Sequence, residues 1–151
     1  MPQSLVQIYL HIVFSTKDRT GFLQDDQLRN DLHAYLGGIC RNLKSPSIVV
    51  GGGEDHVHIL CRLSKIGSVS DLIRELKRDS SKWIKQQDPK LHAFYWQKGY
   101  GAFSISPSHV DALVEYIKNQ EEHHKKETFQ EELRRLCKKY GIELDERYCW
   151  E

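Results

Sequence analysis

Alternation of apolar and polar residues marks three segments of the chain as strands, and a fourth strand is predicted just before the glycines at 51–53. In residues 6–14 every second side chain is apolar, and the same alternation runs through residues 54–63. Since neighbouring side chains of a strand point to opposite faces, each segment is predicted as a strand with one face in a core. Shorter segments at residues 47–50 and 100–106 are predicted as the other two strands.

Apolar residues at helical spacing predict four helices. The predicted ranges are from residue 25 or 26 to about 42, from about 69 to 86, from 107 through 117 and on to Gln120, and from 128 to 140. The third helix has Ser106 as its N-cap and Pro107 at its first position, a common start of a helix. The fourth helix is predicted to end at Gly141.

The order of these elements is strand, helix, strand, strand, helix, strand and then two helices. This order predicts an α+β protein with a ferredoxin-like (RRM-like) βαββαβ antiparallel sheet and C-terminal helices. In that topology the first and third strands are neighbours at the centre of the sheet. We therefore expect Tyr9 and His11 beside His56 and His58 on the open face, where the helix that begins at Pro107 could lie across them.

Two pairs of polar residues could carry chemistry on this face. His56 and His58 lie two apart on one strand, so both imidazoles can reach one divalent ion. A hydrogen-bonded pair of histidines without a metal is the alternative. Tyr116 and Gln120 lie four apart along the edge of a helical apolar stripe, so their side chains are neighbours. The tyrosine could instead pack its ring beside Leu113.

The composition gives no global signal for nucleic-acid binding. The 151 residues include 22 Lys and Arg and 21 Asp and Glu, for a net charge of +1. Binding would therefore need local basic patches. One is the loop with Lys17 and Arg19, and another is the outward face of the helix at 69–86. That face carries Arg74, Lys77, Arg78, Lys82 and Lys85, which could also serve only solvation.

Two further segments allow more than one interpretation. The glycines at 51–53 lack a following Lys-Ser/Thr pair and precede a strand, which favours a hairpin over a phosphate-binding loop. In the aromatic segment that follows Pro89, Phe94 and Phe103 are predicted in the core. Trp96 and Tyr100 could either pack or stack on bases.

The cysteines and the hydropathy of the chain bear on its location. The four cysteines are scattered and form no Cys-x-x-Cys pair, so neither a zinc site nor a disulfide framework is predicted. No apolar run approaches the ~20 residues that span a membrane, and no basic leader precedes an apolar stretch. A cytoplasmic protein with reduced thiols is expected.

Four motifs occur along the chain in a fixed order. They are HIVFSTK at 11–17, GGGEDHVH at 51–58, WQKGYGAFS at 96–104 and YIKNQ at 116–120. Together they resemble the HUH-type single-tyrosine transposases, TnpA-like prokaryotic enzymes that move insertion sequences as single-stranded DNA. The likeness covers nearly the whole chain, so residues 1–151 are expected to form a single HUH transposase domain.

The resemblance implies a mechanism and a set of site residues. It implies that His56, His58 and Gln120 bind a divalent ion, Mg²⁺ or Mn²⁺, and that Tyr116 is the catalytic nucleophile. The expected product is a 5′-phosphotyrosine with a free 3′-OH, so that strands are rejoined without ATP. A homodimer is implied in which the tyrosine helix of one subunit serves the histidines of the other.

The expected substrate is folded single-stranded DNA, such as hairpins at the ends of a mobile element. The expected contacts with DNA come from Lys17, Arg19, Arg78, Lys82 and Tyr100. No general base is evident from the sequence, where a metal-bound water or His123 could serve. His124 falls in the apolar stripe and is expected to be structural.

Three alternatives stay open. A domesticated relative that nicks and rejoins chromosomal repeat hairpins would use the same residues. A non-enzymatic module that binds single-stranded nucleic acid would need the ring of Tyr116 and not its hydroxyl. A metal-dependent phosphoesterase without covalent catalysis would need His56 and His58 but not Tyr116.

Overall fold

Four antiparallel strands form the sheet of the computed structural model, which describes residues 2–147, 149 and 150 and, for residues 121 and 123, only the backbone. The strands are β1 (Tyr9–Ser15), β2 (Ser47–Gly52), β3 (His56–Arg62) and β4 (Gly101–Ile105). Their order across the sheet is β2-β3-β1-β4. β1 and β3 are therefore the central neighbours, which confirms the predicted ferredoxin-like sheet.

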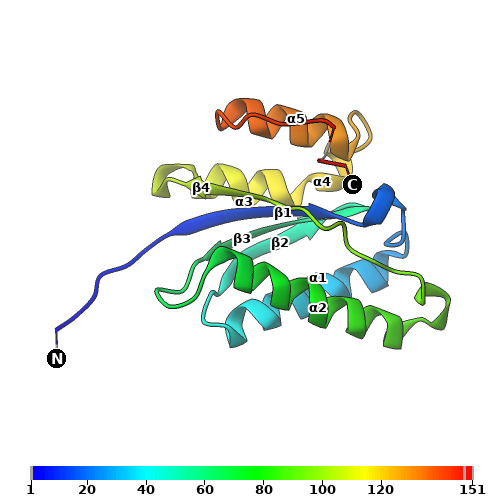
Figure 1. The fold of residues 1–151 in the computed structure, drawn as a ribbon, viewed down its shortest axis with the longest axis horizontal. Helices are drawn as coiled ribbons and strands as arrows, with labels where there is room; N and C mark the ends of the chain where they lie inside the picture. Colours follow the sequence, from blue (N-terminus) through cyan, green and yellow to red (C-terminus); the bar gives the residue numbers. More distant parts are fainter. Residues whose placement is uncertain (1, 148, 151) are drawn as a thin grey trace.

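Helices cover both faces of this sheet (Figure 1). On one face lie α1 (Asp26–Asn42) and α2 (Val69–Gln87), and on the other lie α3 (Val110–Lys118), α4 (Gln120–His123) and α5 (Phe129–Lys139). Short 3₁₀ turns cover Lys17–Arg19, Pro89–Leu91 and Pro107–His109. Among the described residues, no helix is both long and apolar enough to cross a membrane.

The side chains of β1 and β3 alternate between a core and the face that carries the histidines. The face toward α1 and α2 carries Leu10, Ile12, Phe14, Val57, Ile59 and Cys61. On the opposite face, β1 and β3 pair so that His58 lies across from Val13 and His56 across from Ser15. Both histidines are fully buried there beneath the helices that follow β4. The alternation in the sequence therefore predicts correctly which side chains form the core.

The predicted start of the first strand is wrong. β1 begins at Tyr9 rather than at residue 6, and Val6 and Ile8 are 49 % and 44 % exposed. β3 ends at Arg62, which pairs with Tyr9, so the ladder of β1 and β3 stops there. The antiparallel register also places Tyr9 at the far end of β3 from His56. The expectation that Tyr9 lies beside the histidines is therefore wrong, whereas His11 does contact His58.

Polar residues at the helix ends explain where the helices begin. Asp25 accepts a hydrogen bond from the backbone of Leu28 at the start of α1, and Ser68 accepts one from Asp71 at the start of α2. Thr128 and the first turn of α5 form a complete capping box. The predicted third helix is divided: a 3₁₀ turn precedes α3, and the helix breaks at residue 119 before α4.

Gly51 allows α3 to lie directly against β2. A Cβ atom at this position would lie 2.5 Å from the carbonyl oxygen of Ile117, so a side chain larger than hydrogen does not fit. At Gly53 a Cβ atom would lie 3.0 Å from Cε1 of His56. The glycines belong to the hairpin between β2 and β3, as predicted, and their lack of side chains leaves room for α3 and for the ring of His56.

Lys77 is not part of an outward basic face, which corrects the prediction for α2. Its Nζ donates to the carbonyl oxygens of Gln97, Lys98 and Gly99 at 2.6, 3.2 and 2.8 Å. Burial lowers the pKa of this amine to about 8. Trp96, left open by the sequence, is buried and donates to Ser80 at 2.9 Å. Both side chains fix the segment that leads into β4.

Candidate active site

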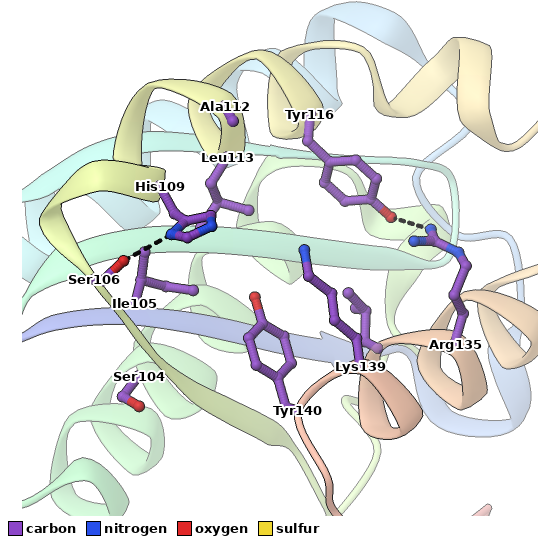
Figure 2. A pocket seen from close by; sticks show the side chains of 11 residues that line it. Ser104, Ile105, Ser106, His109, Ala112, Leu113, Tyr116, Arg135, Lys139 and Tyr140 are labelled. Atoms are coloured by element: carbon purple, nitrogen blue, oxygen red, sulfur yellow. Dashed lines mark hydrogen bonds between the residues drawn. The ribbon is translucent and has the colours of Figure 1, made fainter.

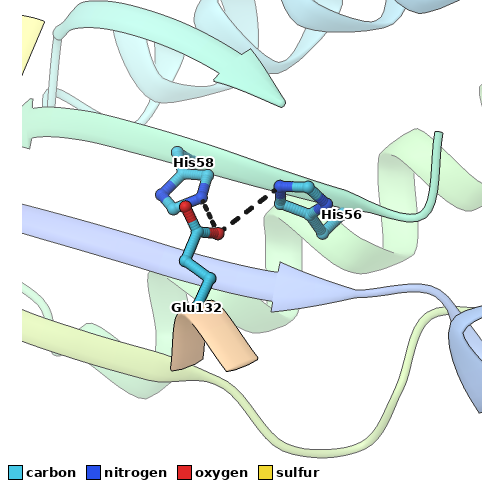
Figure 3. A group of neighbouring side chains, drawn as sticks. All are labelled: His56, His58 and Glu132. Atoms are coloured by element: carbon cyan, nitrogen blue, oxygen red, sulfur yellow. Dashed lines mark hydrogen bonds and ion pairs between the residues drawn. The ribbon is translucent and has the colours of Figure 1, made fainter. Parts of the chain in front are cut away.

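His56, His58 and Glu132 point their nitrogen and oxygen atoms toward a common centre (Figure 3). One such atom from each residue lies within 4.8 Å of the others, and all three side chains are buried. Nε2 of His58 lies 2.8 Å and Nε2 of His56 lies 3.6 Å from the carboxylate oxygen Oε1 of Glu132. The histidines come from β3 and the glutamate comes from α5, so the centre lies between the sheet and that helix.

The outer nitrogens of both histidines are held by other side chains. Nδ1 of His56 lies 2.8 Å from a carboxylate oxygen of Asp55, and Nδ1 of His58 lies 2.8 Å from Nε2 of His11. These contacts leave the Nε2 atoms of both rings directed at the centre. Partners of this kind fix the ring orientation and the tautomer of metal-binding histidines.

Gln120 completes the centre from the first residue of α4. Its amide oxygen lies 2.9 Å from Nε2 of His56, and its amide nitrogen donates to Glu132 at 3.1 Å. Two imidazole nitrogens, a carboxylate oxygen and an amide oxygen thus face one another. This donor set fits a divalent metal ion, for which imidazole and carboxylate are common ligands. The predicted triad of His56, His58 and Gln120 is brought together within one chain.

Tyr116 lies next to this centre on the last turn of α3. Its hydroxyl donates to Glu132, and Nη2 of Arg135 donates to the hydroxyl oxygen at 2.7 Å. The tyrosine ring lies 5.9 Å from the ring of His58, and the guanidinium of Arg135 lies 5.5 Å from the tyrosine ring. The phenol oxygen is therefore held between a carboxylate and a cation, within contact of the residues that face the centre.

The electrostatics of the site keep the carboxylate of Glu132 charged and the imidazoles of His11 and His58 neutral. Burial raises the pKa of Glu132, but hydrogen bonds from His124 and His58 outweigh it and hold the pKa well below its usual range. Burial lowers the pKa values of His11 and His58. Neutral imidazole is the form that binds a metal ion. Burial and then the charge of Glu132 raise the pKa of Tyr116 above its ordinary value.

A pocket between α3 and α5 reaches Tyr116 from outside and has a volume of about 530 Å³. Figure 2 shows the side chains that line it. Arg135 and Lys139 line it from α5, and Tyr140 forms part of its wall. A second, more polar opening of about 590 Å³ reaches His56 from the side of His124. Tyr116 can therefore be approached from solvent, and the second opening ends at the buried His56.

Glu132 and Arg135 are the site residues that the sequence reasoning missed. Glu132 lies three residues after Phe129 and four before Leu136, on the apolar stripe of α5. An acidic residue on such a stripe is a signal of a buried polar contact, because a buried charge needs partners. His124 is also at the site, where Nε2 lies 3.1 Å from Glu132 and its ring lies 4.3 Å from that of His56. The side chain of His123 lies outside the described residues.

The predicted DNA contacts on α2 are far from this centre. Arg78 and Lys82 belong to the helical layer on the opposite face of the sheet, and both are exposed. Arg78 also pairs with the carboxylates of Glu75 and Asp79. Their role in DNA binding stays a prediction, because the tertiary structure places them on the face of the sheet opposite Tyr116.

The remaining predicted contacts follow the end of β1 that pairs with His56, or precede β4. Lys17 is exposed in the 3₁₀ turn after β1. Arg19 donates to the backbone oxygen of Trp150 at 3.2 Å and lies over its ring. Tyr100 is 45 % exposed, with Nζ of Lys77 5.8 Å from its ring. These three residues also stay predicted contacts.

Removing the charge of Glu132 provides a test of the centre. The Glu132→Gln variant keeps the size of the side chain, and we expect it to weaken Mn²⁺ binding by about 10–100-fold. Isothermal titration calorimetry measures the affinity, and Glu115→Gln, on the exposed side of α3, is the matched control. Equal Mn²⁺ affinity in the variant and in the unchanged protein would exclude the carboxylate from the metal site.

Comparisons with known proteins agree with this fold. The family model described as IS200-like transposase matches residues 4–120. A proposed transposase from Deinococcus radiodurans R1 has a similar structure, with a TM-score of 0.65 and 21 % identity over 80 % of this chain and 95 % of that chain. A REP-associated tyrosine transposase bound to a REP hairpin has a TM-score of 0.58 and 16 % identity over 82 % of this chain and 73 % of that one. A comparison with curated proteins found no match.

Proposed function

Because the chain belongs to the family of IS200-like transposases, we propose that it cleaves and rejoins single-stranded DNA through a 5′-phosphotyrosine on Tyr116. In this proposal residues 1–151 act as one HUH transposase domain. The observation that carries it is the position of the Tyr116 hydroxyl, which hydrogen-bonds to the same carboxylate as His58. A tyrosine that only filled space would not need its hydroxyl at this centre.

The phenol oxygen of Tyr116 would attack the scissile phosphorus. A bond forms between this oxygen and phosphorus while the bond from phosphorus to the 3′ oxygen breaks, and the 3′ oxygen takes up a proton as the free 3′-OH. The phenolic proton leaves through water and balances the proton that the 3′ oxygen takes up, while Glu132, whose pKa lies well below its usual range, accepts the hydrogen bond of the hydroxyl and orients it. Attack by another 3′-OH reverses the step and rejoins a strand, so no energy from ATP is needed.

The neighbours of Tyr116 have distinct tasks in this proposal. Arg135 donates to the phenol oxygen and stabilises the phenolate that forms during attack. His56, His58 and Gln120 would hold Mg²⁺ or Mn²⁺, with Glu132 as a further oxygen ligand. A bound ion would polarise the scissile phosphate and stabilise its charge in the in-line displacement.

A hairpin of single-stranded DNA is the proposed substrate. A structural neighbour was solved with a REP hairpin, which supports a folded DNA strand as the partner of this chain. The cations Arg135 and Lys139 line the pocket beside Tyr116, where a DNA phosphate would have to enter. The same chemistry would serve a mobile element or a domesticated hairpin nickase, and the flanking DNA distinguishes the two roles.

A denaturing protein gel tests the proposed chemistry. The protein is mixed with labelled single-stranded DNA from its own flanking sequence in the presence of Mn²⁺ or Mg²⁺. We expect label to migrate with the protein, because a phosphotyrosine bond survives denaturation. A protein that binds this DNA and never forms the adduct would instead be a nucleic-acid-binding module or a phosphoesterase without covalent catalysis.

A homodimer with shared active sites is also part of the proposal. Mixing two inactive variants, Tyr116→Phe and His58→Ala, is expected to restore adduct formation, because an exchanged α3 would join an intact tyrosine with intact histidines. Light scattering measures the mass of each protein before mixing. A mixture that stays inactive would contradict sharing and favour a site built from one chain, in which Tyr116 and Gln120 serve their own histidines.

A further inference from the structure

Gln97 is a buried glutamine whose amide group is unused by the fold. The residue is 5 % exposed, and within the described residues neither Nε2 nor Oε1 has a hydrogen-bond partner. Its backbone is nevertheless fixed, because its N–H donates to Ser15 at 2.9 Å and its carbonyl oxygen accepts from Lys77 at 2.6 Å. Most buried polar groups have a partner, so this amide indicates a ligand that supplies one.

This glutamine lines a pocket of about 360 Å³ between β1, the segment that enters β4, and α5 with the residues that follow it. The volume lies within the range of small-ligand sites, which is about 300–1,000 Å³. Aromatic side chains form much of the wall. They are Tyr100, Phe103, Phe129 and Trp150. The pocket therefore combines flat apolar surfaces with one amide that offers a donor and an acceptor.

Cationic groups surround the aromatic walls of this pocket. The guanidinium groups of Arg19 and Arg134 lie 5.6 and 5.4 Å from the ring of Trp150. Nζ of Lys77 lies 5.8 Å from the ring of Tyr100, and Arg134 also pairs with a carboxylate of Glu146. Positive charge beside aromatic surface suits a ligand that joins a planar ring to an anion.

The pocket is adjacent to the candidate active site. Phe129 lines the pocket and also stacks on His56, with 4.9 Å between the ring centres. Ser15 lines it as well, and in the ladder of β1 and β3 this serine lies across from His56. A DNA strand whose phosphate reaches the histidines would therefore have a nearby nucleotide beside this pocket.

We infer that this pocket binds one unpaired nucleobase of the DNA strand, with the amide of Gln97 on the edge of the base and aromatic rings against its face. The inference rests on the proposed function and adds a place where a base is recognised. The edge of a base presents a donor and an acceptor to which an amide is complementary. An apolar ligand of the same size would leave the amide unpaired.

Strands with and without bases test this assignment. The full-length protein is titrated with labelled dA, dC and dT homopolymers and with an abasic strand of the same length and charge, and fluorescence anisotropy gives the affinities. We expect at least one base-bearing strand to bind about tenfold more tightly than the abasic strand. Gln97→Leu should remove most of this preference and leave the affinity for the abasic strand unchanged, whereas Gln86→Leu, exposed on α2, should change neither.

Stability measurements separate a ligand-binding amide from a structural one. Because the amide of Gln97 makes no hydrogen bond in the described fold, Gln97→Leu should unfold at the same or a higher urea concentration. Gln97→Glu keeps the shape but loses the donor, and it should also lose the preference for bases. Loss of stability in Gln97→Leu with an unchanged preference in Gln97→Glu would overturn the inference.

The outcomes also distinguish this inference from the proposed function. Equal binding of base-bearing and abasic strands, together with a covalent adduct on the gel, would overturn the base pocket and leave the transposase chemistry intact. No binding of any strand and no adduct would contradict the proposed function, and the base pocket with it.

Discussion

The Tyr116→Phe variant is expected to form no covalent adduct with DNA, a loss of about 10⁴-fold or more relative to the unchanged protein. The substitution removes one oxygen, and that oxygen is the only atom of the side chain that can bond to phosphorus. The ring remains, and its centre stays 5.9 Å from the centre of the His58 ring. DNA binding should therefore stay within about twofold, because the phosphate contacts that give most of the affinity are unchanged.

Tyr140→Phe is the matched control for this variant. Tyr140 lines the same pocket as Tyr116, but its ring stacks on Phe103 at 4.6 Å and belongs to the packing of α5 on the sheet. Its variant should form the adduct at the ordinary rate. An adduct that persists in Tyr116→Phe would assign the nucleophile to another residue. A Tyr116→Phe variant that binds DNA and functions in the cell as the unchanged protein does would favour a non-enzymatic module that binds nucleic acid.

The second large effect is expected for His56→Ala, which should lose metal-dependent cleavage while the protein remains folded. His56 offers Nε2 to the centre and is held by Asp55 through its other nitrogen. Loss of one nitrogen ligand of a divalent ion should weaken Mn²⁺ binding by at least about 100-fold, more than the change expected for an outer partner. Calorimetry with Mn²⁺ and the adduct gel measure the two effects separately.

Folding of His56→Ala needs its own measurement because the ring is buried and stacks on Phe129 at 4.9 Å. Removing a buried ring leaves a cavity, and we expect a loss of about 2–4 kcal/mol in the free energy of unfolding. His92→Ala, at an exposed histidine in the turn before β4, should change neither stability nor activity. Complete unfolding of His56→Ala would instead identify His56 as a residue that the fold requires, and it would contradict the expected loss of activity in a folded protein.

Much of the fold follows from local patterns of the sequence. Alternation along β1 and β3 separates the core residues from the histidines, since a strand turns each successive side chain to the opposite face. Ser68 and Thr128 mark helix starts because their side chains accept hydrogen bonds from free backbone N–H groups. These signals are local, so the sequence alone determines which segments are strands or helices and which face of each is apolar.

The sequence predicts only in part which side chains meet in the site. The spacing of His56 and His58 and that of Tyr116 and Gln120 each place two side chains on one face of one element. That both pairs meet depends on how α3 lies on the sheet, which the close approach at Gly51 allows. Tyr9 illustrates the opposite case, because its face was predicted correctly but the register of β1 and β3 carries it away from the histidines.

Only the tertiary structure decided that Glu132 joins the centre and that the amide of Gln97 finds no partner among the described residues. Glu132 contacts His58 from 74 residues away, across the gap between α5 and β3. Such contacts are set by the packing of whole elements, since no local periodicity encodes the distance between two side chains so far apart in the chain. The sequence by itself therefore determined most of the elements and their faces, and its resemblance to a family predicted Tyr116 as the nucleophile and His56 and His58 as metal ligands. The packing of α5 on the sheet decided which side chains surround these residues.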